Sequence, residues 1–280
     1  MQCISCDNKS LIEYSKDSYM KLPIYFCSIC GMYITGRNEE EIKNRSIEIY
    51  KKEYWDKREA EEAIRTNYSD INSQGKKRQW ISQFAYCKPY FKNKNFLEIG
   101  CGQGQTIFWF EENGFNVSGI EPDERNVLLI NQKLKSGYCK AGFAEEFNIS
   151  GDYDIIWISH VFEHLIRPDL LLIKCKEHLR SNGILFIEVP NCENENVLKS
   201  SIFQNPSSFH FTKKALTNLV IKAGFKVERS DYFRSPSKLE GALNKILKKI
   251  SYELYPYYPK IITNNKNGTD IRIILKNNTD

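Results

Sequence analysis

Four cysteines near the N-terminus have the residue type and the spacing of a metal site. Cys3 and Cys6 form one C-x-x-C pair, Cys27 and Cys30 form a second, and 20 residues separate the two pairs. Two such pairs at two hairpin tips supply four thiolates to a closed tetrahedral zinc site. A closed site has no open position for a substrate. We therefore expect the zinc to stabilise the fold of residues 1–36 and to take no part in catalysis.

The segment Glu98-Ile99-Gly100-Cys101-Gly102-Gln103-Gly104 follows a predicted strand and opens a predicted helix. Its glycines allow a tight turn and let a ligand approach the backbone beside the positive end of the helix. Nicotinamide sites have the spacing G-x-G-x-x-G, whereas this segment has G-x-G-x-G and an acid, Glu98, just before the loop. Glu121 ends the next predicted strand, where a carboxylate can hold both hydroxyls of a ribose.

Histidines are the candidates for acid–base chemistry. His160 directly follows an apolar strand, at the strand end where open α/β sheets bind ligands, and is a candidate base or substrate orienter. His164 and His210 are further candidates. The position of His164 favours a structural hydrogen bond over a direct role, and the alternative for His210 is a hydrogen-bonded histidine packed in the core. His178 lies near the end of a charged helix, which indicates a surface position. The sequence does not separate His160 from His210 as the base.

Short apolar runs and helical segments alternate from residue 95 onward. The apolar runs predict strands at 96–99, 116–120, 153–158, 184–189 and from 225 onward. The segments between them predict helices at 106–113, 125–134, 169–180 and 212–223. This alternation predicts an α/β fold, a Rossmann-like doubly wound parallel sheet with helices on both faces.

The segments on either side of this sheet are less regular. Dense alternating charge predicts a long exposed helix over 38–66, and a second helix extends to about residue 91. A Lys/Leu-rich helix near 238–254 and a last strand at 271–275 follow the sheet. The chain thus divides into four parts: a zinc ribbon (1–36), a helical cap or linker (37–92), a Rossmann-like domain (93–230), and a C-terminal helix and last strand (231–280).

The composition excludes several classes of protein. A net charge of +5, from 40 basic and 35 acidic residues, is a weak excess and argues against a nucleic-acid partner. No stretch approaches the roughly 18 apolar residues that would span a bilayer. The N-terminus lacks the basic and apolar regions of a secretory signal, so we expect a cytoplasmic protein with reduced thiols.

The glycine loop and Glu121 begin a longer series of motifs. The series continues through Tyr153–Trp157, Ser159–Leu165, the turn 179–183, Phe209–Thr212 and Ala223–Phe225, and it covers roughly residues 95–230. In this order the motifs resemble those of class I S-adenosylmethionine (AdoMet) methyltransferases. The resemblance implies that the domain 93–230 binds AdoMet and that the chain is a methyltransferase.

The resemblance also implies a role for each motif. The glycine loop with Glu98 would face the amino-acid part of AdoMet, and Glu121 would bind the ribose diol. Phe143 and Ala144 would flank adenine, and Ser159 with His160 would lie beside the sulfonium. The implied cofactor-binding residues are Glu98, Gly100, Cys101, Gly102, Gly104, Gln105, Glu121, Pro122, Phe143, Ala144, Ser159 and His160, and the candidate catalytic residues are His160, His210 and His164.

A four-cysteine ribbon ahead of an AdoMet domain is similar to a bacterial group whose better-known members modify sugars or surface-glycan precursors. The resemblance implies methyl transfer, most simply to oxygen, on a sugar, sugar nucleotide or glycan substituent, as in capsule or polysaccharide biosynthesis. Two alternatives remain open. One is an rRNA or tRNA methyltransferase with a zinc module, against which the weak charge counts. The other is a non-catalytic protein that uses the ribbon to bind a partner. The sequence does not indicate the oligomeric state.

Overall fold

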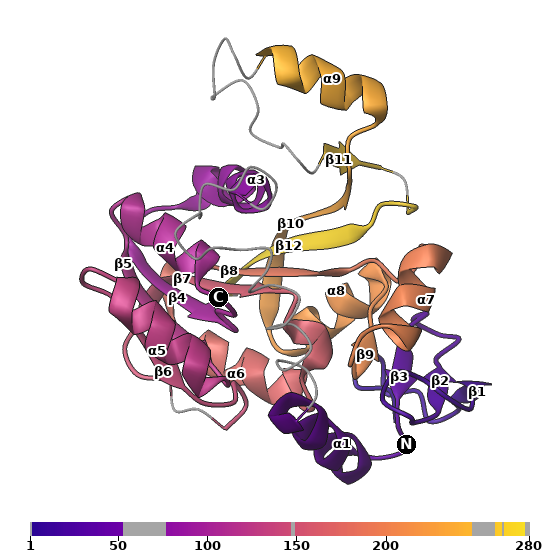
Figure 1. Cartoon of the computed structure of the whole chain (residues 1–280). Coiled ribbons are helices and arrows are strands. Elements are labelled where there is room, and N and C mark those ends of the chain that lie inside the picture. The colour runs from indigo at the N-terminus through magenta and orange to yellow at the C-terminus, as the bar shows by residue number, and fades with distance from the viewer. Residues whose placement is uncertain (1, 53–76, 147–148, 248–260, 265, 278–280) are drawn as a thin grey trace.

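The structure is a computed structural model that describes residues 2–52, 77–146, 149–247, 261–264 and 266–277. Two sheets organise the described part of the chain (Figure 1). The larger sheet has eight strands in the order β11-β10-β12-β8-β7-β4-β5-β6, and the smaller has four in the order β1-β2-β3-β9. The α/β Rossmann-like expectation is confirmed.

One half of the large sheet is parallel, as expected. Its strands are β4 (Asn95–Ile99), β5 (Asn116–Glu121), β6 (Tyr138–Ala141), β7 (Tyr153–Ser159) and β8 (Leu179–Pro190). The other half is antiparallel: β12 (Asp270–Asn277) pairs with β8 on one side and with β10 (Phe225–Arg234) on the other, and β11 (Ile261–Thr263) forms the edge. The sheet is therefore mixed: β12, its last long strand, lies between β8 and β10 and is antiparallel to both.

Helices cover both faces of this sheet. The covering helices are α3 (Lys77–Cys87), α4 (Gln105–Glu112) and α5 (Glu124–Lys133) on one face, and α6 (Pro168–His178) and α8 (Lys213–Lys222) on the other. Side chains of β7 alternate between the two cores: Ile155 and Trp157 pack with α4, whereas Ile156 and Ile158 pack with α6 and α8. A strand buried on both faces reads as a continuous apolar run, which explains why β7 is recognisable in the sequence. The predicted helix 169–180 ends earlier, at His178, because Leu179 begins β8.

The N-terminal segment forms the small sheet from β1 (Ile12–Ser15), β2 (Ile24–Phe26) and β3 (Tyr33–Thr35). Its fourth strand, β9 (Phe209–His210), comes from the Rossmann-like part of the chain and pairs antiparallel with β3. The cysteines Cys3, Cys27 and Cys30 share one apolar core with α6 and α8. The ribbon is thus joined to the large domain by a shared sheet and a shared core, and it lies beside α7 (Glu195–Phe203) in Figure 1.

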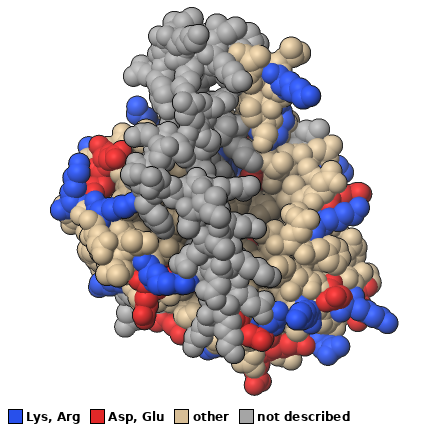
Figure 2. All heavy atoms as spheres, viewed as in Figure 1, with Lys and Arg blue, Asp and Glu red and all other residues tan. Residues whose placement is uncertain are grey.

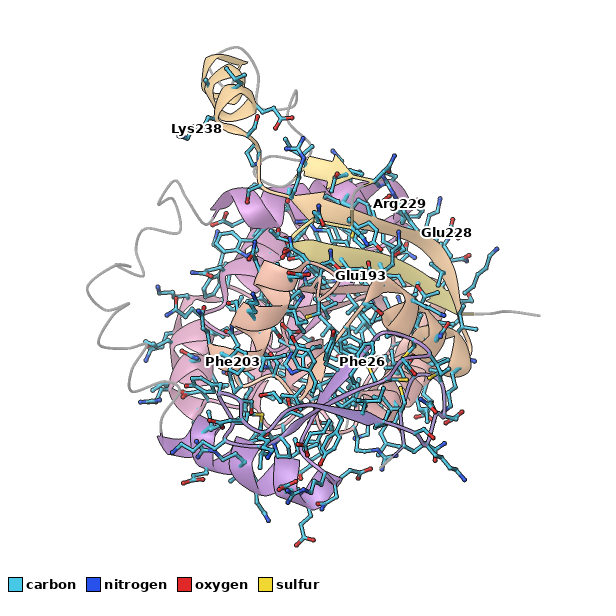
Figure 3. The ribbon with its side chains drawn as sticks, turned by 90° about the vertical axis from the view of Figure 1, so that its right-hand side faces the viewer. Phe26, Glu193, Phe203, Glu228, Arg229 and Lys238 are labelled. Carbon is cyan, nitrogen blue, oxygen red and sulfur yellow. The ribbon has the colours of Figure 1, made fainter. Side chains whose placement is uncertain are left out.

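Two further helices lie outside the layers. α1 (Glu39–Lys52) begins where the charge pattern predicts, and the rest of the predicted helix 38–66 lies outside the described residues. α9 (Lys238–Leu247) projects from the end of β10, where Figure 3 labels Lys238 above Glu228 and Arg229. Arg234 anchors the first turn of α9 through two hydrogen bonds to Glu240, of 2.7 and 2.8 Å. Among the described helices, none combines the length and apolar character that a bilayer crossing requires.

Candidate functional site

A cavity of about 710 Å³ opens where β4, β5 and β7 end. In open α/β sheets, the carboxyl ends of the strands are where ligands bind. Eight of the twelve predicted cofactor-binding residues line it: Gly100, Gly102, Glu121, Pro122, Phe143, Ala144, Ser159 and His160. The opposite wall comes from α1 and from the segment 164–170, and includes Lys43, Ile47 and Leu165. The structure therefore gathers most of the sequence-predicted site around one space.

The glycine loop shapes the floor of this cavity. Gly100 and Gly102 both have positive φ angles, of 79° and 53°. A Cβ at Gly100 would lie 2.2 Å from a methyl group of Val161, so only glycine lets the loop pack against that side chain. A Cβ at Gly102 would meet nothing within 4 Å. The backbone at Gly102 therefore borders open space that a ligand could fill.

Glu121 is held at the rim by the loop itself. Gly102 N–H donates to Glu121 Oε2 at 2.8 Å, and Asp123 N–H donates to Oε1 at 3.1 Å. Burial raises the pKa of Glu121 to about 7. Each carboxylate oxygen keeps a lone pair after these bonds, so the side chain can still accept two hydroxyl groups. This geometry fits a ribose diol.

Four predicted cofactor residues are not among the residues that line the cavity. Glu98 is buried, its Oε2 has no hydrogen-bond partner among the described residues, and burial raises its pKa well above the usual range. Cys101 faces Cys139, with 3.8 Å between the sulfur atoms. A Cβ at Gly104 would lie 2.7 Å from Ile130, and Gln105 begins α4. Their contact with a cofactor stays a prediction.

His160 lies among carboxylates at the end of β7. Its Nε2 is 3.0 Å from Glu188 Oε1 and 3.7 Å from Asp270 Oδ1, and its Nδ1 is 3.6 Å from Glu163 Oε1. Burial alone would lower the pKa of His160, but Glu163 and Glu188 outweigh it and raise the pKa well above 6.5. In these surroundings the imidazole of His160 takes up a proton at neutral pH. An imidazole that already carries this proton is a poor base.

His164 also lines the cavity and is held differently. Its Nδ1 lies 3.1 Å from the carbonyl oxygen of Pro206, which can only accept, so Nδ1 carries a proton. The neutral ring therefore has its lone pair on Nε2, which lies 3.8 Å from Glu163 Oε1. Nε2 of the neutral ring could therefore accept a proton, and Glu163 would stabilise the imidazolium that forms.

A family model described as "Methyltransferase domain" matches residues 70–230. The chain belongs to this methyltransferase family. Among curated relatives, the ubiquinone biosynthesis O-methyltransferase of Caulobacter vibrioides is 30% identical over 108 residues, which are 36% of this chain and 42% of that protein. The tRNA U34 carboxymethyltransferase of Campylobacter lari is 27% identical over 211 residues, 70% of this chain and 68% of that protein. The chain spans only about two-fifths of the length of the first ubiquinone-pathway relatives.

Solved structures share the fold of this methyltransferase domain. The plantazolicin methyltransferase BamL, solved with a desmethylPZN analog and SAH, superposes with a TM-score of 0.59 at 13% identity, covering 86% of this chain and 97% of that one. A SAM-dependent methyltransferase from Archaeoglobus fulgidus gives 0.55 at 21% identity, covering 80% of this chain and all of that one. At such identities the likeness shows the fold alone.

The buried charges behind His160 in the methyltransferase domain escaped the sequence analysis. Glu188 and Arg272 are fully buried and form an ion pair across β8 and β12. Gln83 Nε2 donates to Glu188 Oε1 at 2.7 Å and to Ser159 Oγ at 2.9 Å. Although burial opposes ionisation, Arg272 and His160 hold the pKa of Glu188 well below its usual range. The sequence did contain one signal of this network: each of the two apolar runs 184–189 and 271–275 includes one charged residue. A charge buried in such a run requires a partner.

His210 is absent from the described lining of the cavity. Its ring is buried between Ser201 Oγ, 2.7 Å from Nδ1, and Thr35 Oγ1, 3.1 Å from Nε2. Thr35 Oγ1 gives its proton to Ser207 O at 2.7 Å, so it accepts from His210 Nε2–H, and Nδ1 accepts from Ser201. Burial lowers the pKa of His210 to about 3. This geometry indicates a neutral histidine with a structural role. The catalytic role of His210 stays a prediction, and no described contact with the cavity supports it.

We expect His210→Asn to lower stability by about 1–3 kcal/mol and to leave turnover near normal, because the buried hydrogen-bonded ring that is lost is not among the residues that line the cavity. The stability that the neutral ring confers on the wild type falls as pH drops below 6.5, where the unfolded histidine takes up a proton that the folded one refuses. Urea unfolding should therefore show the difference between wild type and variant shrinking by about 2 kcal/mol from pH 7 to pH 5. A difference independent of pH would contradict this assignment.

The structure also brings the four predicted metal ligands together. The sulfur atoms of Cys3 and Cys30, and those of Cys6 and Cys27, are 3.5 Å apart, and all four lie within 4.8 Å of one another. Ligands of a tetrahedral zinc with bonds of about 2.3 Å lie about 3.8 Å apart. The arrangement has the ligand number and spacing that such a site needs.

Proposed function

We propose that the chain is an AdoMet-dependent methyltransferase that methylates an oxygen of a small-molecule acceptor, a sugar, sugar nucleotide or surface-glycan substituent. The observation that carries the proposal is the open space beside the backbone of Gly102, together with Glu121, which accepts a hydrogen bond from the Gly102 amide. Bound AdoMet supplies an already activated methyl group, so the protein mainly positions the acceptor and excludes water. Glu121 would hold the ribose, and Phe143 and Ala144 the adenine.

His164 is our proposed base for an acceptor hydroxyl. The Pro206 carbonyl fixes its Nδ1 proton, which leaves Nε2 to accept the proton of the hydroxyl, and Glu163 would stabilise the imidazolium that forms. His160 lies between Glu163 and Glu188 and would orient the acceptor instead. The sequence left His160 and His210 open as the base, and this proposal gives that role instead to His164, the third candidate.

We expect His164→Gln to lower kcat by about 100-fold while the affinity for S-adenosylhomocysteine is unchanged. His178→Gln is the matched control, since its Nδ1 also lies close to a backbone carbonyl, that of Gly151 at 2.8 Å, on the exposed surface. Steady-state rates on the acceptor found by screening sugar nucleotides and glycan precursors would test this. Near-normal turnover of His164→Gln would exclude His164 as the base.

We further propose that Cys3, Cys6, Cys27 and Cys30 hold one structural Zn²⁺ as thiolates, in a cytoplasmic protein. The four sulfur atoms converge, and the positive φ of Gly31, 78°, turns the chain directly after Cys30. The metal would fix the end of the hairpin that contains β3, the strand that pairs with β9. It has no open ligand position and supports the acceptor site only through the fold.

An RNA acceptor is the second candidate, favoured by the tRNA-modifying relative from Campylobacter lari. Against it, Figure 2 shows blue and red side chains intermingled over the described part of one face, with no extended basic field. RNA binding through phosphates weakens steeply with salt. Measured RNA affinity that falls strongly between low and physiological salt would support this alternative over a sugar acceptor.

A further inference from the structure

A second cavity, of about 880 Å³, lies between the N-terminal ribbon and the helices α6 and α8. Cavities of roughly 300–1,000 Å³ with apolar walls are the usual sites of small ligands. Apolar side chains reach this space from the ribbon, from the segment before α6, from both helices and from β9: Ile4, Ile34, Ile166, Ile173, Phe209 and Leu219. We call it the apolar cavity, since its size and its walls suit the hydrocarbon part of a ligand.

The apolar cavity adjoins the cavity of about 710 Å³ described above, here called the cofactor cavity. Glu39, Glu40 and Ile166 line both spaces. The two glutamates begin α1 and are exposed, so part of the partition between the cavities consists of side chains that can move aside. The proposed base, His164, is two residues from Ile166, so their Cα atoms lie at most about 7 Å apart. An acceptor whose hydroxyl reaches His164 can therefore extend past Ile166 into the apolar cavity.

The charges at the rim of the apolar cavity discriminate between possible acceptors. The charged side chains of the described lining are Asp7, Glu39, Glu40 and Asp169 on the acidic side and Arg37 and Lys222 on the basic side. Lys222 is already paired with Asp7 at 2.6 Å, and Arg167 of the cofactor cavity is paired with Asp169 at 2.8 Å. A diphosphate is bound by arginine and lysine side chains that are in excess over carboxylates. This lining has no such excess, so it disfavours a sugar nucleotide and suits an uncharged chain.

We propose that the acceptor is a glycolipid, a sugar attached to an uncharged hydrocarbon chain, and that the apolar cavity holds this chain. The sugar lies in the cofactor cavity beside His164, and the chain passes Ile166 toward Ile34 and Ile173. This inference rests on the methyl transfer proposed above and narrows its acceptor from sugars in general to lipid-linked ones. It also gives the ribbon a part in acceptor binding, because Ile4 and Ile34 belong to it.

Calorimetric titration of the full chain with decyl β-glucoside, below the concentration at which it forms micelles, tests the apolar cavity. Methyl β-glucoside should bind at least 100-fold more weakly, because each methylene that leaves water adds to the affinity. Ile173→Glu should weaken binding of decyl β-glucoside at least tenfold. Ile221→Glu is the matched control, because Ile173 and Ile221 are 47% and 55% exposed on α6 and α8, and Ile221 does not line the apolar cavity. We expect this control to bind like the wild type.

A second titration, in the presence of saturating S-adenosylhomocysteine, places the chain. Decyl β-glucoside should still bind, because the two ligands occupy different cavities. Three results would overturn the proposal: equal affinity for the two glucosides, equal binding by Ile173→Glu and Ile221→Glu, or displacement of decyl β-glucoside by S-adenosylhomocysteine. Failure of S-adenosylhomocysteine itself to bind would instead overturn the methyl transfer, and with it the assignment of the chain to an acceptor, whereas the glucoside affinities report on the apolar cavity alone.

Discussion

The Gly102→Arg variant is expected to bind S-adenosylhomocysteine at least 100-fold more weakly than the wild type while it remains folded. A Cβ at this position meets nothing within 4 Å, so the protein accommodates the new side chain in the very space that a cofactor needs. The long arginine side chain would fill the open space beside Glu121 and disturb the hydrogen bond between Glu121 and the amide of residue 102. Calorimetric titration of both proteins measures the difference.

Backbone strain alone has to be separated from this effect. Gly102 has φ of 53°, a conformation that costs any residue with a Cβ roughly 1 kcal/mol. Gly151→Arg is the matched control, because Gly151 has φ of 92°, is exposed, and is not among the residues that line the cavity. It should bind the ligand as the wild type does. Retained affinity in Gly102→Arg would refute the placement of the cofactor.

Removal of the proposed zinc is expected to have the largest effect on stability. Structural zinc sites contribute about 10 kcal/mol or more in small zinc-binding peptides, and the N-terminal segment has little other core of its own. Without this metal, the four cysteines would lack the bonds proposed to hold the hairpin that contains β3, and we expect the pairing of Ile34 with Phe209 to be lost as well. Chelation after mild denaturation should lower the melting temperature by more than 10 °C.

Cysteine variants give the controls for that experiment. Cys27→Ser should abolish zinc content and lower the melting temperature to the same degree as chelation. Cys192→Ser should retain one zinc per chain, since Cys192 packs with Ile24 of the ribbon but is not among the four converging sulfurs. A protein that melts identically with and without metal would show that the cysteines do not form a structural site.

Sequence patterns predicted the helices and strands whose structure depends on residues close by in the chain. The strand β7 is apolar on both faces, and α8 has its capping threonine, Thr212, directly before it, so both are visible in the sequence. The two-residue strand β9 is not visible, because its only reason to be a strand is β3, some 175 residues earlier. The antiparallel insertion of β12 depends in the same way on distant neighbours.

The candidate site divides along the same line. The glycine loop and Glu121 were identifiable because the turn and the strand end lie within a short stretch of chain. Glu188 and Arg272 were not, because a buried charge acquires its meaning only from a partner on another strand. His210 was a catalytic candidate because related enzymes place a substrate-contacting loop at its position, whereas its ring faces Thr35 of the ribbon. Short stretches of sequence identified the predicted cofactor loop but not the ionic network.

The position of β12 has a consequence for synthesis on the ribosome. The strand occupies residues 270–277, yet it fills a gap between β8 and β10 in the interior of the sheet. At roughly 5–20 residues per second, a nascent chain waits about 4–18 s between making Glu188 and making the end of β12. During that interval Glu188 lacks Arg272, and the edges of β8 and β10 remain open to other strands. We expect ribosome-bound intermediates to depend on chaperones until the last strand emerges, and chains truncated before β12 to aggregate.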